Sequence, residues 1–203
     1  MKIICIGRNY TEHTKEMASP VPDKPVFFFK PDTALLRNNQ PFFYPLFSNE
    51  VHHEVEVVIK INRLGRNIAE KFAHRYYNEI GLGIDFTARD LQQECKQKGL
   101  PWEISKAFDG AAPISNFVNI ETLGDIKSID FWLDKNDETV QRGNTSQMIF
   151  SADKLIAYLS QFVTLKIGDL IYTGTPSGVG PIKIGDRLKA YMNDNLMLDF
   201  FIR

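Results

Sequence analysis

The chain has 203 residues, of which 43% are hydrophobic and 24% are charged, so it can bury the core of one globular domain, which we expect to span residues 1–203. Its 24 lysines and arginines nearly balance 25 aspartates and glutamates, and a net charge of −1 without a long basic tract disfavours a nucleic-acid partner. No run approaches the roughly 20 apolar residues that span a bilayer, so we expect neither a nucleic-acid nor a membrane partner.

The N-terminus and the cysteines indicate the compartment. The opening MKIICIGRNY has only a short apolar stretch and lacks the small-residue cleavage site of a signal peptide. Cys5 and Cys95 lie far apart and belong to no CxxC motif or disulfide framework, which suits a reducing environment. We therefore expect a cytoplasmic protein.

The N-terminal part predicts two short strands on either side of a proline-rich break. Residues 3–6 form an apolar run ended by Gly7, and residues 27–30 form an aromatic run typical of a strand. Between them, residues 9–17 are polar and can form a helical turn, while residues 18–25 contain three prolines that interrupt any helix.

The middle of the chain predicts one strand followed by two helices. Residues 54–61 alternate acid and valine before they become fully apolar, the pattern of a strand with one wet or functional face. Residues 68–79 and 88–98 have helical composition. Thr87 is a candidate N-cap for the second helix, with Asp90 at its third position.

The C-terminal part predicts several strands around one helix. Two strands at 129–133 and 139–142 flank the polar sequence Lys-Asn-Asp-Glu and predict a β-hairpin. Ser151 is placed to cap a helix that runs to residue 161 with apolar side chains on one face. Three more strand candidates follow, separated by turns that contain Gly, Asn or Asp: residues 170–173, 187–192 and 196–202. The sequence thus predicts one β-rich domain with a few helices.

A pair of acids in the strand at 54–61 is the first candidate for chemistry. Side chains two apart on a strand point to the same face, so Glu54 and Glu56 place two carboxylates side by side. Such close like charges repel, and Mg²⁺, Mn²⁺ or Ca²⁺, which prefer hard oxygen ligands, would relieve the repulsion. The alternative is a solvated strand edge, but the apolar run after Glu56 indicates a strand that enters a core.

A third acid would complete a set of metal ligands. Asp85 follows the short apolar run 81–84 and precedes the second predicted helix, and a strand end before a helix is a usual place for a ligand. Asp90 is the rival, but an acid in the first helical turn already serves the helix dipole. We therefore favour Asp85 as the third ligand.

Three further features could act beside such a metal, and each has a plain structural alternative. His13 and Glu16 share one face of a helical turn, so the carboxylate can orient the imidazole as a base, although most exposed pairs of this kind are structural. Lys106 lies in an apolar stretch, where it has a buried anionic partner or extends to solvent. The glycine-rich segment 174–180 is a tight turn or a nest of backbone N–H groups that binds a carboxylate.

Together these segments resemble the fumarylacetoacetate hydrolase family along nearly the whole chain. The matching motifs stand in the family's order: Gly7-Arg-Asn-Tyr10 followed by His13 and Glu16, Phe29-Lys30-Pro31, His53-Glu54-Val55-Glu56, Asp85-Phe-Thr-Ala-Arg-Asp90 with Gln92, Gly99-Leu-Pro-Trp102, Lys106-Ala-Phe108 and Gly174-Thr-Pro-Ser-Gly-Val-Gly180. One such motif alone is weak evidence, whereas this ordered set is strong. The similarity is greatest to the short, single-domain members.

The resemblance implies an α+β, β-rich fold, a mixed β-sandwich roll with a few peripheral helices, as a single catalytic domain that forms a homodimer. It also implies bound Mg²⁺ or Mn²⁺, with Ca²⁺ as the third candidate. The implied metal ligands are Glu54, Glu56 and Asp85, and the implied water-activating dyad, on a mobile lid, is His13 with Glu16. Lys106 is implied to face the substrate. The implied contacts to the substrate carboxylate are Arg89, Gln92 and Thr175.

The expected activity is divalent-metal-dependent cleavage of a small 2-oxo acid or dicarboxylate through a stabilised enolate. Loss of CO₂ from oxaloacetate leaves the enolate of pyruvate, and the same enolate departs when water attacks the distal carbonyl of an acylpyruvate. One alternative is isomerisation or tautomerisation of oxaloacetate or a 2-hydroxy-diene-dioate. The other is a metal-binding β-domain without catalysis, which the joint presence of dyad, acids and lysine disfavours.

Overall fold

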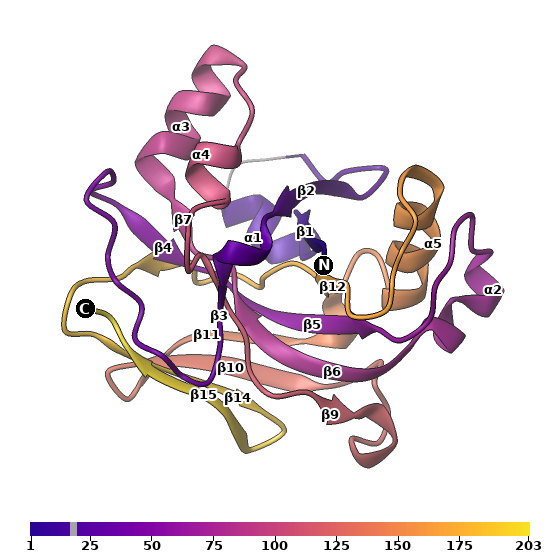
Figure 1. Cartoon of the computed structure of the whole chain (residues 1–203). Helices are drawn as coiled ribbons and strands as arrows, with labels where there is room; N and C mark the ends of the chain where they lie inside the picture. Colours follow the sequence, from indigo (N-terminus) through magenta and orange to yellow (C-terminus); the bar gives the residue numbers. More distant parts are fainter. Residues whose placement is uncertain (17–19) are drawn as a thin grey trace.

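Two β-sheets packed face to face form the body of the protein (Figure 1). The computed structural model describes residues 1–16 and 20–203, and within them the larger sheet has six strands in the order β2-β1-β12-β5-β6-β9. The smaller sheet, over the same described residues, has four in the order β11-β10-β14-β15. The larger sheet consists of β1 (Ile3–Gly7), β2 (Val26–Lys30), β5 (Val55–Ile61), β6 (Tyr77–Ile84), β9 (Val118–Asn119) and β12 (Leu170–Tyr172), and the smaller of β10 (Asp130–Lys135), β11 (Glu138–Asn144), β14 (Arg187–Met192) and β15 (Asn195–Phe201).

Short ribbons and helices surround the two sheets. The ribbons are β13-β4-β7, made of Gly180–Pro181, Val51–His53 and Thr87–Ala88, and the parallel pair β3 (Leu35–Leu36) and β8 (Ala112–Pro113). The helices are α1 (Thr11–Glu16), α2 (Glu70–Ala73), α3 (Arg89–Lys98), α4 (Glu103–Lys106) and α5 (Ala152–Phe162). Figure 1 shows α3 and α4 above one end of the larger sheet and α5 at the other. Among the described residues, no helix is long and apolar enough to cross a membrane.

The pattern of burial explains why these strands form a sandwich. Every second residue of β14 is buried, as expected for a strand with one face on a core. The larger sheet is mixed, because β1 runs parallel to β12 and antiparallel to β2. In β5 nearly all residues are buried, so one face contributes Val57 and Ile59 to the core while the other buries Glu56. The mixed, strand-rich fold that the sequence predicts is confirmed, and it buries an acid on its central strands.

Several predicted elements are present. The hairpin is β10–β11, with Asn136 and Asp137 at its tip in the left-handed conformation that tight hairpin turns require. Ser151 Oγ accepts a hydrogen bond from the backbone N–H of Lys154 at 3.3 Å and caps α5. The helix predicted at 88–98 is α3. The turn predicted at 9–17 corresponds to α1 as far as residue 16, whereas residues 17–19, including the start of the proline-rich break, lie outside the described residues.

Two local predictions are wrong. The helix predicted at 68–79 is reduced to α2 and a 3-10 turn, and from Tyr77 the chain enters β6, where Glu79 pairs with Lys60 of β5 at 2.7 Å. Strand pairing outweighs the helical composition here because it buries the apolar residues that follow. Thr87 is not the N-cap of α3: it lies in β7, the cap is Ala88, and the Thr87 hydroxyl bonds to Glu54 instead.

Candidate active site

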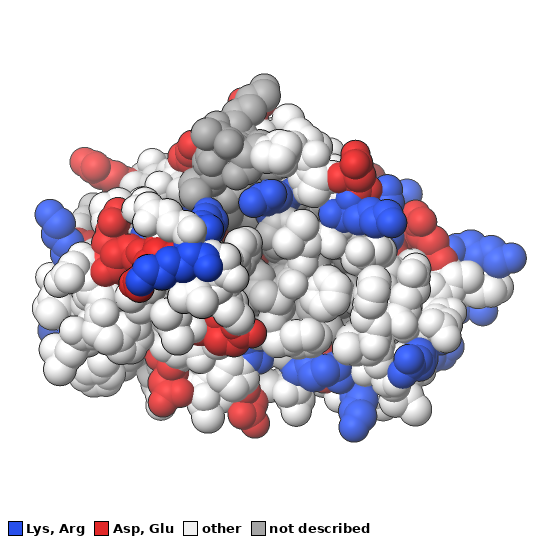
Figure 2. Space-filling view, turned by 90° about the horizontal axis from the view of Figure 1, so that it is seen from above, with Lys and Arg blue, Asp and Glu red and all other residues white. Residues whose placement is uncertain are grey.

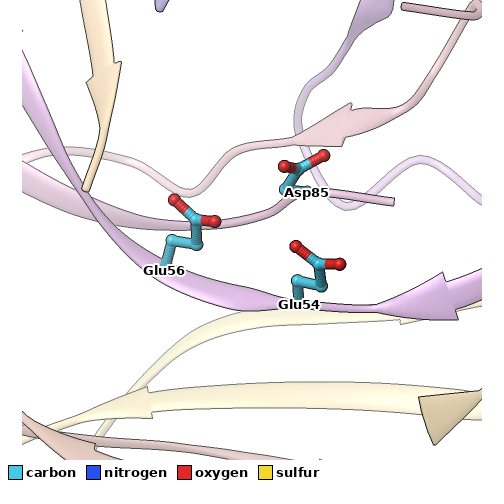
Figure 3. Close-up of side chains that lie close together, drawn as sticks. All are labelled: Glu54, Glu56 and Asp85. Atoms are coloured by element: carbon cyan, nitrogen blue, oxygen red, sulfur yellow. The ribbon is translucent and has the colours of Figure 1, made fainter. Parts of the chain in front are cut away.

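The three predicted acids converge where β5 begins and β6 ends (Figure 3). The antiparallel register places Glu56 opposite Gly83, two residues before Asp85. The backbone N–H of Asp85 donates to the carbonyl of Glu54 at 2.8 Å and holds the two segments together. One oxygen from each carboxylate lies within 4.8 Å of the others, and all three residues are buried. Strand spacing and strand pairing thus bring the predicted ligands together.

This carboxylate trio has the chemistry of a divalent-metal site. Three buried like charges so close together repel each other strongly in a medium of low dielectric constant. Carboxylate oxygens are the hard donors that Mg²⁺ and Mn²⁺ prefer. Asp85 Oδ1 is buried and accepts no well-directed hydrogen bond from the described residues, although Lys30 Nζ lies 2.7 Å away. Glu54, Glu56 and Asp85 could therefore hold one metal ion.

Lys106 supplies positive charge to this trio from the end of α4. Its Nζ donates to Glu54 Oε2 at 3.0 Å, to Asp85 Oδ2 at 2.8 Å and to the hydroxyl of Thr87. The residue is 3% exposed, so the alternative in which it extends to solvent is wrong. Burial alone would lower the pKa of Lys106, but the carboxylates of Asp85 and Glu54 outweigh burial and raise it, which keeps the ammonium charged.

The two glutamates titrate in opposite directions. At Glu54 burial favours the neutral acid, but the charges of Lys106 and Arg89 outweigh it and hold the pKa below its usual range. At Glu56 burial acts together with the negative charges of Asp85 and Glu54, and the pKa is raised well above its usual value. A cation that binds here therefore competes with a proton on Glu56.

The glycine-rich segment 174–180 binds carboxylates of the chain itself. The N–H of Gly174 donates to Glu56 Oε2 at 2.7 Å, and the N–H of Gly178 donates to Glu16 at 3.1 Å. Gly178 has φ 93°, and a Cβ there would lie 2.3 Å from a backbone carbonyl oxygen of β11, so only glycine fits. The segment is a turn whose N–H groups position one predicted metal ligand and one member of the predicted dyad.

The three predicted substrate contacts line one cavity with the carboxylates. Arg89 donates from Nη2 to Glu54 Oε1 and from Nη1 to Gln92 Oε1, each at 2.7 Å, and both residues lie in the first turn of α3. Thr175, in the glycine-rich segment, lies on the same cavity, which has a volume of about 50 Å³. All three residues are buried. Their polar atoms therefore face a small space shielded from bulk water.

The predicted dyad also reaches this cavity. His13 is 7% exposed and lines the cavity, with Nδ1 3.1 Å from Glu16 Oε2. In this pair the imidazole is therefore buried against the cavity, while the carboxylate of Glu16 is exposed. A proton on Nδ1 that is bonded to the carboxylate leaves the lone pair on Nε2, the arrangement of a histidine base.

No role was given to two residues of the site in the sequence analysis. Lys30, at the end of β2, is 2% exposed, and its Nζ donates to the carbonyls of Phe86 at 3.2 Å and Ala111 at 2.9 Å, beside Asp85. The sequence pattern that could have indicated it is a lysine directly after an aromatic strand, comparable to the apolar stretch that drew attention to Lys106.

Gln141 is the second, and its role depends entirely on the fold. Its Oε1 accepts from the N–H of Val55 at 3.0 Å and lies 2.9 Å from Nδ1 of His53, while its Nε2 donates to the hydroxyl of Thr175 at 2.9 Å. Burial lowers the pKa of His53 to about 4, so this imidazole is neutral. A glutamine in the middle of a hairpin strand gave no sequence signal for this network.

A larger cavity lies away from these carboxylates. It has a volume of about 800 Å³ and is lined by Val57 and Ile59, which alternate with Glu56 along β5 and face the other side of the sheet. None of the candidate site residues is among its lining residues. The candidate site residues therefore belong to the smaller cavity.

Buried carboxylates, a charged lysine and an oriented histidine around one shielded cavity place the chain in the class of metal-dependent enzymes that act on small anions. Its sequence matches the family model described as Fumarylacetoacetate (FAA) hydrolase C-terminal over residues 2–198. The chain belongs to the fumarylacetoacetate hydrolase family and is an enzyme of that family.

Individual relatives are similar over nearly their whole length. The mitochondrial oxaloacetate tautomerase of Mus musculus is 44% identical over 201 residues, which cover 99% of this chain and 91% of that protein. The mitochondrial oxaloacetate decarboxylase of Dictyostelium discoideum is 42% identical, with coverage of 100% and 94%. The crystal structure of fumarylpyruvate hydrolase from Pseudomonas aeruginosa in complex with Mn²⁺ and pyruvate has a TM-score of 0.94 at 34% identity, covering 100% of this chain and 89% of that one.

Proposed function

We propose that the chain is a Mg²⁺- or Mn²⁺-dependent enzyme that converts oxaloacetate, a dicarboxylic 2-oxo acid, through an enolate. The observation that carries the proposal is the buried trio of Glu54, Glu56 and Asp85, with Lys106 bonded to two of its members. Two relatives support the substrate, since one is named a tautomerase and the other a decarboxylase of oxaloacetate. Both reactions pass through an enolate, which forms by loss of a proton from C3 or by loss of CO₂.

The three carboxylates would hold the cation. When bound there, Mg²⁺ or Mn²⁺ supplies Lewis acidity to the keto oxygen and the adjacent carboxylate of a 2-oxo acid and so stabilises an enolate. Mn²⁺ is present in the similar fumarylpyruvate hydrolase structure, and Ca²⁺ is the third hard cation that suits the donors.

The residues around the carboxylates orient the substrate and exclude water. Arg89 is held by Glu54 and Gln92, so its guanidinium is already fixed before a substrate carboxylate arrives. Lys106 keeps its charge in a buried position, where it stabilises negative charge that develops on the substrate oxygen. In this proposal Thr175, positioned by Gln141, completes the contacts to the substrate carboxylate.

His13 is the proton carrier of the proposed reaction. With Glu16 bonded to Nδ1, its Nε2 can remove the proton from C3 of oxaloacetate and return it, which is what keto–enol conversion requires. Decarboxylation leaves the same kind of enolate without a base, so it depends less on His13.

Hydrolysis of an acylpyruvate is a second candidate, and the dyad favours it. A water molecule activated by His13 would attack the distal carbonyl, and the enolate of pyruvate would leave. The structural similarity to a fumarylpyruvate hydrolase supports the same alternative.

The test compares three reactions in one preparation. The purified protein is stripped with a chelator, reloaded with Mg²⁺ or Mn²⁺, and assayed for decay of oxaloacetate enol, for pyruvate release from oxaloacetate and for acetylpyruvate cleavage, each corrected for the enzyme-free rate. We expect metal-dependent conversion of oxaloacetate, its loss in Glu56→Gln and its retention in Glu94→Gln, because Glu94 lies on the exposed side of α3. Cleavage of acetylpyruvate alone would replace the proposal with the hydrolase candidate.

Three further expectations belong to this proposal. We propose that the enzyme is a homodimer, that residues 1–203 act as one catalytic domain, and that it works in the cytoplasm. Light scattering coupled to gel filtration measures the first, limited proteolysis the second, and localisation of a tagged chain the third.

A further inference from the structure

Two basic side chains on the small cavity form no ion pair with an acid in the part of the chain that the structure describes. Arg8 and Lys96 line the cavity together with the carboxylate trio. The other three cations of the site are each paired, since Arg89, Lys106 and Lys30 lie within 3.0 Å of a site carboxylate. Within residues 1–16 and 20–203, by contrast, no acidic side chain forms an ion pair with Arg8 or Lys96.

Helix α3 and the residue after β1 bring these two cations to the cavity. Lys96 lies seven residues after Arg89 on α3, and Gln92 lies between them, so all three are on the face of the helix that borders the cavity. Lys96 Nζ lies 5.8 Å from the ring centroid of Trp102, another cavity residue. Arg8 follows β1 with φ 61°, a conformation that a non-glycine residue rarely adopts. Strained conformations of this kind concentrate at binding sites.

The positive charge is local to the cavity. On the face of the protein seen in Figure 2, basic and acidic side chains are interspersed. Arg8 is half-buried, whereas Lys96 borders the cavity but is itself exposed. Partial burial lowers the pKa of Lys96, and the nearby positive charges of Arg89 and Arg8 lower it further. A divalent cation on the carboxylate trio adds two more positive charges. The summed positive charge of the cavity therefore favours a ligand with more than one negative charge.

We propose that Arg8 and Lys96 bind the distal carboxylate of a dicarboxylic 2-oxo acid, the one remote from the keto group, and so select dianions over 2-oxo acids with an uncharged end. This inference rests on the proposed function, which places the keto acid end at the carboxylate trio. The half-buried Arg8 contributes more to the selection than the exposed Lys96, because a charge pair that is partly removed from water is screened less.

The experiment compares two substrates that differ only in charge. Oxaloacetate and its distal monoamide, 2-oxosuccinamate, have nearly the same shape, but the amide end is neutral. Keto–enol conversion is the reaction measured, because the monoamide has no distal carboxylate to lose as CO₂. With the Mg²⁺-loaded enzyme, Lys96→Gln and Arg8→Gln should each raise KM for oxaloacetate by roughly tenfold, the order expected for one lost charge-assisted hydrogen bond. KM for the monoamide should change less than twofold, and Lys96→Arg should restore most of the oxaloacetate KM. Lys98→Gln, an exposed lysine on the same helix, is the matched control.

A binding measurement separates this inference from the proposed function. Calorimetry with the Mg²⁺-loaded protein compares L-malate and L-lactate, 2-hydroxy acids that differ in the distal carboxylate and need no turnover. A preference for malate that disappears in the Lys96→Gln Arg8→Gln double variant supports the inference even if oxaloacetate is not converted. Equal losses for malate and lactate, or for oxaloacetate and its monoamide, would overturn it, and so would unchanged binding.

Discussion

Replacement of Glu56 by glutamine should stabilise the metal-free protein while it destroys the metal site. Glu56 is 1% exposed, and its pKa is raised by burial and by the charges of Asp85 and Glu54. Glutamine keeps the shape of the side chain and an oxygen that can accept the N–H of Gly174, now 2.7 Å from Oε2. It removes the negative charge that the buried neighbours oppose.

The sign of the effect with pH follows from the raised pKa. A carboxyl that binds its proton more tightly in the folded state than in the unfolded state lowers stability as the pH rises from its unfolded pKa, about 4.3, to its folded pKa. The stability advantage of Glu56→Gln should therefore grow from acid to alkaline pH and then level off. We expect about 1–3 kcal/mol at pH ~8, the cost of a buried polar group without its full set of hydrogen bonds. For a chain of this size that is a rise in Tm of about 2–12 °C.

Calorimetric melting of wild type and variant in chelator at several pH values between acid and alkaline measures this difference. Addition of Mg²⁺ should reverse the order, because only the wild type gains the free energy of metal binding. Glu94→Gln, on the exposed side of α3, is the control for loss of one acid. A metal-free Glu56→Gln protein that melts at or below the wild type at pH ~8 would refute the reasoning.

Three further predictions concern the base, the lysine and the lid. His13→Ala should lower the rate of acylpyruvate cleavage roughly 10²–10⁴-fold, the range for general-base catalysis, and lower pyruvate release from oxaloacetate much less. Equal losses of the two activities in steady-state assays would contradict a role of His13 specific to hydrolysis. Lys30→Met removes the ammonium that lies 2.7 Å from Asp85. In chelator this should lower the free energy of unfolding by about 3–5 kcal/mol, the usual loss when one partner of a buried ion pair is removed. Denaturant unfolding measures this loss, and Mg²⁺ should restore part of it. Amides of residues 10–16 should gain protection from hydrogen exchange when oxalate and Mg²⁺ bind, because we expect the segment that carries His13 to close over the ligand; unchanged protection would rule out a lid.

Much of the candidate site follows from short-range periodicity. Glu54 and Glu56 lie on one face because a strand repeats every two residues, and their apolar neighbours correctly indicate burial. Arg89 and Gln92, which the family resemblance indicated, meet in the structure because three residues make nearly one helical turn. The same relation brings His13 to Glu16 in α1. Each relation is local, so the amino-acid sequence carries it directly.

Other parts of the site depend on segments that are distant in the sequence. The sequence left open whether Lys106 is paired or solvated, and the packing of α4 beside Asp85, 21 residues earlier, decided it. Gln141 supports Thr175, 34 residues away, only because the hairpin folds onto the glycine-rich segment. Burial and ionic partners of this kind arise from packing, which no local pattern records.

By itself, the sequence determined the β-rich class, the acid pair of Glu54 and Glu56, the helix that carries Arg89, and through its ordered motifs the family. Only the tertiary structure decided that residues from Tyr77 form a strand, that Thr87 serves the site and not a helix cap, and that Lys30 belongs beside Asp85. The physical reason is the same in each case. A charged or polar residue has similar local propensities in several settings, and its state is settled by which distant groups are buried against it.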